Sequence, residues 1–261
     1  MSDAHISYES HDGIGTITID RPAKKNAMTF AMLGELSDAV AEGIDDDGAR
    51  ALILTGVPGA FCAGTDLSDL QDTPEEQRSS GGQAPRAGGV PPLMACPKPI
   101  VCAIDGPAIG MGAEFTSMCD VRIATPRARF GWVFVHRGLV PDTGAGTWVL
   151  PRLIGVQEAA RLLFSGEIIG AERAIELGYL LAVVEPDDLD AAAREEAGRF
   201  IAGSPFAIRE TKALLYAGIG RSFDEHVGAT REVMERCFRS EDHREGVASF
   251  LERRPPNFTG R

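Results

Sequence analysis

The first two thirds of the chain alternate short apolar runs with helical patterns. Residues 14–20 alternate apolar with polar or small side chains, as a half-buried strand does, and a helical pattern follows at about 28–44. The segments 51–56 and 99–106 are apolar runs that end in glycine, and 121–124 is a third run, as expected of strands buried on both faces. This order predicts an α/β fold.

The last third of the chain is predicted to be almost entirely helical. Helix starts are expected at Val156, Ala171, about residue 187, the Ser204–Pro205 pair and the capping box Ser222–Glu225. These helices either pack back on the α/β core or pack on another subunit.

Two segments of the chain need a separate interpretation. Residues 71–92 are rich in Gly, Pro, Ser, Gln and charge with almost nothing to bury, which predicts a mobile loop. Near the end, Val247, Phe250 and Leu251 form one helical stripe. Taken alone, such a stripe is typical of core packing, and assembly is the alternative.

Composition and charge exclude several classes of protein. The chain has 261 residues and 44% hydrophobic content, enough for a sizeable core. Its net charge of -12 and pI near 4.9 argue against a nucleic-acid or anionic-membrane partner, which would need a basic surface. There is no signal-like N-terminus and no apolar segment long enough to span a membrane, so a cytoplasmic protein is expected.

Cofactor and metal motifs are missing from the sequence. No GxGxxG follows the first strand and no GxxxxGK[ST] occurs, which argues against a nicotinamide or ATP enzyme. The cysteines show neither a CxxC pair nor metal-ligand spacing, so buried reduced thiols and no metal site are expected. They are Cys62, Cys96, Cys102, Cys119 and Cys237.

Two glycine-bearing stretches carry the first candidate chemistry. "GAFCAGTDLSDL" (59–70) and "DGPAIGMGAEFTSMCD" (105–120) each follow a buried strand and lead toward a helix. Each is a good tight turn, but glycine also lets backbone approach a ligand, and a helix N-terminus leaves amide N–H groups free. Two such loops side by side would aim two amides at one oxygen, as an oxyanion hole does.

The motifs together carry a family resemblance along essentially the whole chain. In order they read "RPAKKNAM", "GAFCAGTDL", "KPIVCAIDGPAIGMGAEFTSMCD", "FGWVFVHRGLVPDTGAGT" and "EGVASFLERRPPNF", and they resemble the crotonase, or enoyl-CoA hydratase/isomerase, superfamily. The resemblance implies a spiral of strand-strand-helix turns in residues 1–200, which would hold the acyl-CoA site. It also implies a helical region in residues 201–261 that mediates trimerisation, commonly as a dimer of trimers.

The chemistry implied by this resemblance is stabilisation of an acyl-CoA thioester enolate, as in fatty acid metabolism. Coenzyme A is then part of the substrate and no separate cofactor is expected. By position in the motifs, the amides of Thr65 and Met111 would form the oxyanion hole.

Glu114 is the first candidate for proton transfer. It falls one turn inside the helix after the second glycine loop, among apolar neighbours, where desolvation should raise its pKa. A structural ion pair, for example with Arg122, is the alternative. The resemblance favours catalysis, because Glu114 matches the first catalytic carboxylate of the family.

The second carboxylate decides the reaction. Hydratases of this family carry another glutamate twenty residues after the first, but this chain has Phe134 there. Asp142, in "HRGLVPDTGAG", is a good turn residue by local sequence. Several isomerase branches of the family carry an aspartate in this context, so we interpret Asp142 as the partner of Glu114. Phe134 would also dry the pocket.

The resemblance assigns further binding positions. Seven residues are predicted to contact CoA: Lys24, Lys25, Ala63, Asp66, Leu67, Phe250 and Arg253. For the lysine pair, a merely solvated turn is the alternative. In relatives, an aromatic and a basic residue at the Phe250 and Arg253 positions reach a neighbouring subunit's CoA, which favours assembly for the last helix. Three residues are predicted to line the acyl pocket: Trp132, Phe134 and His136.

Three functions follow from these residues. The first is an enoyl-CoA isomerase that uses Glu114 and Asp142. The second is an enoyl-CoA hydratase that uses Glu114 alone, and the third is a non-catalytic acyl-CoA-binding protein. The sequence fixes neither the acyl group nor the choice between trimer and hexamer.

Overall fold

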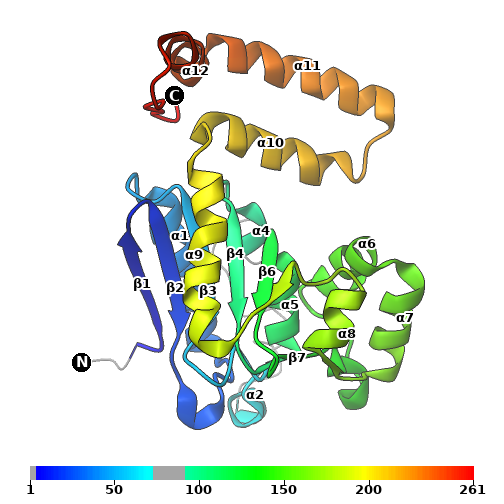
Figure 1. Ribbon diagram of the computed structural model, residues 1–261. Helices are drawn as coiled ribbons and strands as arrows, with labels where there is room; N and C mark the ends of the chain where they lie inside the picture. Colours follow the sequence, from blue (N-terminus) through cyan, green and yellow to red (C-terminus); the bar gives the residue numbers. More distant parts are fainter. Residues whose placement is uncertain (1–3, 73–91) are drawn as a thin grey trace.

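The computed structural model describes residues 4–72 and 92–261 (Figure 1). Its larger sheet has six strands in the order β1-β2-β3-β4-β6-β9. Their bounds are β1 Ile6–His11, β2 Ile14–Ile19, β3 Ala51–Gly56, β4 Ile100–Ile104, β6 Val121–Ala124 and β9 Ala182–Val183. Strands β1 and β2 form an antiparallel hairpin, and all other neighbours in this sheet are parallel.

A smaller sheet lies at the ends of the parallel strands. It contains β5 (Pro107–Ile109), β7 (Arg129–Gly131) and β8 (Ile169–Gly170) in that order. Strand β4 continues into β5 and then a helix, and β6 continues into β7, so successive turns give one strand to each sheet. This is the predicted spiral of strand-strand-helix turns.

Helices and shorter helical turns fill the rest of the described chain. The α-helices are α1 (Phe30–Asp45), α2 (Leu67–Asp72), α4 (Pro92–Ala95), α5 (Met111–Met118), α6 (Leu150–Ile154), α7 (Val156–Ser165), α8 (Ala171–Glu176), α9 (Leu189–Ile201), α10 (Pro205–Gly218), α11 (Phe223–Arg239) and α12 (Glu241–Glu252). The 3-10 turns are η1 (Pro22–Lys24), η2 (Val133–Arg137) and η4 (Pro186–Asp188), and η3 (Ala145–Val149) is a π-helix.

Side chains alternate between the two faces of the large sheet. In β3, Leu52 and Leu54 belong to the main core, whereas Ala51 and Ile53 point to the opposite face. There they pack with Ala193 and its neighbours on α9, the helix that lies over one face of the sheet in Figure 1. Both faces are therefore buried, which explains why β3 reads as a continuous apolar run.

Helices α10, α11 and α12 stand together beyond one end of the sheet (Figure 1). Polar contacts tie them to the core: Lys212 Nζ lies 2.6 Å from Asp120 Oδ2, and the Tyr216 hydroxyl donates to Asp120 Oδ1 at 2.6 Å. On the other side, the Arg50 guanidinium donates to the carbonyl oxygen of Phe258 at 2.8 Å. The anchoring of this helical region is therefore largely polar.

The apolar stripe of α12 is not part of a core. Val247, Phe250 and Leu251 are 48%, 82% and 75% exposed in the single chain. The interpretation of this stripe as core packing is wrong, because the residues point away from the body that the chain itself provides. Other exposed apolar side chains on α10 and α11 are Leu215, Phe223, Met234 and Phe238.

Most predicted elements are confirmed. The strand at 51–56, the strand at 121–124 and the helix starts at Val156 and Ala171 match to the residue. Ser204 and Ser222 are the predicted N-caps, and Ser222 with Glu225 forms the full capping box. Nearly all of the predicted mobile segment 71–92 lies outside the described residues.

The structure contains free thiols, and no membrane-spanning helix was found among the described residues. All five cysteines are free, four of them buried and Cys237 partly so, as predicted. Within the described ranges, no helix is both long and apolar enough to cross a membrane.

Candidate active site

Two backbone segments lie side by side at the N-terminus of α5. The Cys62 amide donates to the Pro107 carbonyl at 2.8 Å, and the Ile109 amide donates back to the Cys62 carbonyl at 2.9 Å. A parallel bridge also joins Thr65 to Met28, where the Met28 amide binds the Gly64 carbonyl at 2.8 Å. The two glycine loops recognised in the sequence are therefore brought together.

Glycine allows the close approach of these loops. A β-carbon on Gly64, at φ 102°, would lie 2.9 Å from the Ile109 carbonyl oxygen, closer than side chains tolerate. One on Gly112 would stand 2.2 Å from the Cys62 carbonyl oxygen. The backbones of Gly64 and Gly110 are in contact, with a β-carbon on either one 4.0 Å from the α-carbon of the other. These loops could not pack this way with larger residues.

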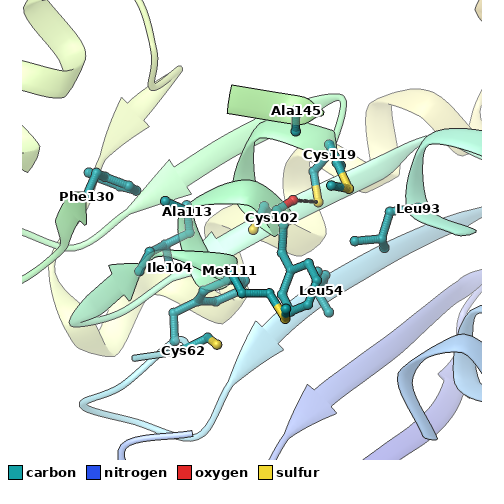
Figure 2. Close-up of a cluster of buried hydrophobic side chains, with 14 of the residues drawn as sticks. Leu54, Cys62, Leu93, Cys102, Ile104, Met111, Ala113, Cys119, Phe130 and Ala145 are labelled. Atoms are coloured by element: carbon teal, nitrogen blue, oxygen red, sulfur yellow. Dashed lines mark hydrogen bonds between the residues drawn. The ribbon is translucent and has the colours of Figure 1, made fainter. Parts of the chain in front are cut away.

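Thr65 and Met111 directly follow the two glycines that meet. No acceptor within the described part of the chain binds the amide of either residue. Met111 is the first residue of α5, whose N-terminus adds a partial positive charge. Its side chain lies in the core with Cys62, Ile104 and Phe130 (Figure 2), so the backbone is held firmly. This geometry fits the predicted oxyanion hole.

Glu114 is completely buried one turn into α5. Burial raises its pKa from 4.5 to about 7, a hydrogen bond from Thr143 opposes the rise, and the charge of Asp142 adds to it. The alternative of an ion pair with Arg122 is wrong. The Arg122 guanidinium instead donates to the carbonyls of Tyr179, Thr116 and Cys119.

Asp142 and Thr143 come to Glu114 from the loop before η3. The Thr143 hydroxyl donates a hydrogen bond to Glu114 Oε2, and the Ala145 amide donates to Thr143 Oγ1 at 3.2 Å. The Asp142 side chain is exposed to solvent in the single chain, yet protein atoms around its carboxyl group desolvate it enough to raise its pKa. The loop that carries Asp142 therefore lies against Glu114, and the charge of Asp142 acts on the Glu114 carboxyl group.

Gly146 closes the other side of the Glu114 carboxyl group. A β-carbon on Gly146 would lie 2.5 Å from Glu114 Oε1 and 3.0 Å from Trp132 Cδ1. Glu114 Oε1 and Trp132 Nε1 are both buried, and neither has a hydrogen-bond partner in the described segments. Such unsatisfied buried atoms are rare, and a site for a ligand or water explains them. Gly146 belongs to a π-helix, a feature that is frequent at functional sites.

The predicted acyl-pocket residues separate in the structure. Trp132 is buried, with its ring 5.5 Å from that of Tyr179, and Phe134 is nearly buried in η2. His136 is exposed, and its ring packs over Gly166 at the end of α7. Trp132 is thus beside the Glu114 carboxyl group, whereas His136 faces α7.

The predicted CoA residues of the first half lie around the first glycine loop. Lys24 and Lys25 are exposed in and after η1, and the Ala63 amide binds the Lys25 carbonyl at 3.0 Å. Leu67 is exposed at the start of α2. Asp66 is buried and accepts a hydrogen bond from Arg21 at 2.7 Å, which lowers its pKa, so its carboxylate holds the loop together.

Phe250 and Arg253 lie far along the chain on and after α12. Both are exposed, and Arg253 adopts a left-handed conformation at the C-cap. The neighbouring Arg254 is bound to Glu245 and Glu252, whereas Arg253 makes no ion pair with the residues that the structure describes. Within residues 4–72 and 92–261, no group of three or more His, Cys, Asp or Glu could hold a metal ion.

Sequence reasoning missed two residues of the site. Thr143 and Gly146 both touch the Glu114 carboxyl group, yet the sequence marks them only as parts of a turn. The signal that was available was their position within four residues of Asp142.

Comparison with known proteins shows the family of this chain. The family model described as enoyl-CoA hydratase/isomerase matches residues 9–261. A probable enoyl-CoA hydratase of Rhodobacter capsulatus is 36% identical, with 100% of both chains covered. A 1,2-epoxyphenylacetyl-CoA isomerase of Escherichia coli is 34% identical over 95% of this chain and 96% of its own.

The same similarity holds for solved structures. An enoyl-CoA hydratase from Mycobacterium tuberculosis H37Rv has a TM-score of 0.90 and 33% identity, covering 99% of this chain and 100% of the other. The chain belongs to the enoyl-CoA hydratase/isomerase family, within the crotonase superfamily. It is therefore an enzyme of the acyl-CoA thioester class that this family defines.

Proposed function

We propose that this enzyme moves a carbon–carbon double bond along an enoyl-CoA thioester, using Glu114 and Asp142 for proton transfer. The observation that carries the proposal is that the loop carrying Asp142 packs against the Glu114 carboxyl group. The charge of Asp142 raises the pKa of Glu114, and the residue beside Asp142 binds Glu114 directly. With two carboxyl groups at one site, the ionised one can remove a proton from one carbon and the protonated one can return a proton to another.

The protonation state of Glu114 suits such a reaction. Its pKa of about 7 means that both the acid and the base are populated near neutral pH. Asp142 also has a raised pKa, because protein atoms desolvate it. Glu114 can therefore take or supply the proton, and Asp142 is the proposed partner.

The reaction is balanced without water. A carboxylate removes a proton from C2 of a 3-enoyl thioester, and the electron pair spreads over the thioester oxygen as a dienolate. The amides of Thr65 and Met111 would stabilise that oxygen by about 3 kcal/mol for each donor. A proton delivered to C4 then moves the double bond to C2–C3, and the mass of the substrate is unchanged.

Phe134 supports isomerisation over hydration. The second glutamate that the family resemblance places in hydratases would stand at this position, but the chain carries a nearly buried aromatic ring there. A phenyl ring can neither activate water nor donate a proton. Hydration with Glu114 alone is the second candidate, and it is favoured by the hydratase names of several relatives.

Substrate binding and assembly complete the proposal. CoA would lie along the exposed Lys24, Lys25 and Leu67, and Phe250 with Arg253 would reach the CoA of a second subunit. Self-association through α10, α11 and α12 is supported by their exposed apolar side chains, because large exposed patches mark interfaces. Trimers or dimers of trimers are the expected assemblies.

A thioester panel tests the function. The purified enzyme would be given 3-enoyl-CoA, dienoyl-CoA and crotonyl-CoA substrates, with product mass and ultraviolet absorbance recorded. We expect double-bond movement without mass change, lost in both Glu114→Gln and Asp142→Asn by about 10²-fold or more. The exposed Asp187→Asn is the matched control and should retain activity.

Two results would contradict isomerisation. Water addition to crotonyl-CoA that is lost in Glu114→Gln and survives in Asp142→Asn would assign a hydratase. Binding of every thioester without turnover would assign an acyl-CoA-binding protein.

A further inference from the structure

We propose that Thr143 is a positioning residue that holds Oε2 of Glu114, so that the proton exchanged with the substrate is carried by Oε1 alone. The role in turnover rests on the proposed function. The hydrogen bonding that it requires belongs to the free enzyme and can be measured without substrate.

The direction of the Thr143 hydrogen bond follows from its two neighbours. The Ala145 amide is a donor and points at Thr143 Oγ1 at 3.2 Å. Glu114 Oε2 is the other neighbour of the same hydroxyl oxygen. Because the Ala145 amide can only donate, the single hydroxyl proton of Thr143 is directed to Oε2. Thr143 therefore stabilises the ionised carboxylate.

The two oxygens of Glu114 are consequently not equivalent. Oε2 is occupied by Thr143, whereas Oε1 is buried without a partner among the described residues. The nearby Gly146 and Ala145 amides also lower the pKa of Glu114, although neither one makes a hydrogen bond to Oε1. When Glu114 is protonated, the proton belongs on Oε1, because Oε2 already receives one from Thr143.

The charged surroundings of Glu114 give Thr143 a second effect. Asp142, on the same loop, is the neighbouring charge that raises the pKa of Glu114. Tyr179 packs against α5 through Thr116 and Ser117 and stays protonated, because burial raises its pKa to about 12. Arg122 lies over the Tyr179 ring with its donors on backbone carbonyls. Burial and the charge of Asp142 raise the pKa of Glu114, whereas the Thr143 hydrogen bond lowers it. Thr143 thus keeps Glu114 able to ionise near neutral pH.

The test is a titration of the Glu114 carboxyl group in the substrate-free enzyme. Carboxyl ¹³C resonances of selectively labelled glutamate would be followed against pH by NMR, and Glu114→Gln would identify the signal. In Thr143→Val, which keeps the shape but removes the hydroxyl, the midpoint should move upward by about one pH unit. Thr143→Ser should restore it. The exposed Thr147→Val, on the π-helix η3 that follows the Thr143 loop, is the matched control.

Turnover gives an independent readout. The acid limb of kcat/KM should move upward with the titration midpoint in Thr143→Val, and kcat should fall about 10-fold while KM is retained. If Thr143→Val does not fold, Thr143→Ala and Thr143→Ser form a second pair that separates loss of the hydroxyl from loss of the methyl group.

Defined outcomes overturn the proposal. An unchanged midpoint in Thr143→Val or Thr143→Ala would do so, as would a serine variant that behaves like valine. A shifted midpoint in an enzyme that isomerises no thioester would refute the proposed function while supporting the hydrogen-bonding role of Thr143.

Discussion

Oε1 of Glu114 lies 2.5 Å from the point where a β-carbon on Gly146 would stand. Real side chains do not approach so closely, so Gly146→Ala must displace the carboxylate. We expect kcat/KM to fall about 10²-fold, because the proposed function uses this carboxylate for proton transfer and small displacements of such a group have large effects. Stability should fall by about 1–3 kcal/mol from overpacking. Steady-state kinetics and urea unfolding would measure both.

The control for this change is Gly34→Ala on α1, where no atom lies within 4 Å of the new β-carbon. It should leave activity unchanged. Full activity in Gly146→Ala would mean that the Glu114 carboxyl group can move freely, which contradicts the packing described above.

Glu114 also makes the folded state pH-dependent. Its pKa rises from 4.5 to about 7 on folding, mainly through burial, so the folded protein binds more protons between these values. Protonation of Glu114 therefore favours the folded state. Its contribution to the free energy of unfolding is fully present below about pH 4.5 and is lost as pH rises through about 7. Glu114→Gln should therefore gain stability relative to wild type with rising pH, by about 3 kcal/mol above pH 7.

Thermal unfolding at pH 5.5 and pH 8.5 would check this prediction. The exposed Glu172→Gln on α8 serves as the control, and its difference from wild type should not vary with pH. A Glu114→Gln difference that is the same at both pH values would show that the carboxyl group is not strongly desolvated.

Lys212 anchors the C-terminal helices to the core. Its ammonium group binds Asp120 at 2.6 Å and the Lys98 carbonyl at 2.9 Å, and its side chain is only 10% exposed. Lys212→Met should cost about 2–4 kcal/mol, because Asp120 loses its cation in a partly buried place. Urea unfolding measures this loss. The exposed Arg236→Met, which breaks an ion pair with Glu210, should cost less than about 1 kcal/mol, and equal costs would contradict the anchor.

Self-association should depend on the apolar face of α10, α11 and α12. The double variant Phe238→Ser, Leu251→Ser removes side chains that are 60% and 75% exposed in the single chain. We expect sedimentation to change from an oligomer to smaller species, whereas Glu232→Ser on α11 should not alter it. A wild-type protein that sediments as a monomer, or an unaffected double variant, would contradict assembly through this face.

Sequence patterns predicted the elements in which apolar side chains form a long run or repeat at a regular spacing. Strand β3 was found because both of its faces are buried, which produces an unbroken apolar run. Strand β1 was missed, since only Ile6 is buried there and the other positions are partly or fully exposed. Strands β8 and β9 have two residues each, too few to show any period.

Parts of the candidate site stand out in the sequence where the signal is local. Glu114 and the paired glycine loops are visible in the sequence because each depends on its own neighbours. Thr143 and Gly146 act through contacts with Glu114, about thirty residues earlier in the chain. His136 was expected beside Phe134, but the 3-10 turn η2 directs nearby side chains to different faces and places His136 over Gly166.

The segments around Cys62 and Ile109 pair through their backbones, and the proposed carboxylates stand elsewhere. Binding of the substrate oxygen and proton transfer would therefore be carried out by different parts of the enzyme. The groups proposed to bind the substrate oxygen are main-chain amides. No exchange of the Thr65 or Met111 side chain would delete them, and only a disturbed backbone path would. The carboxylates stand on other segments, α5 and the loop before η3. If the residues act as proposed, new proton-transfer chemistry can be installed by replacing a few side chains, while the backbone that stabilises the charge is left intact.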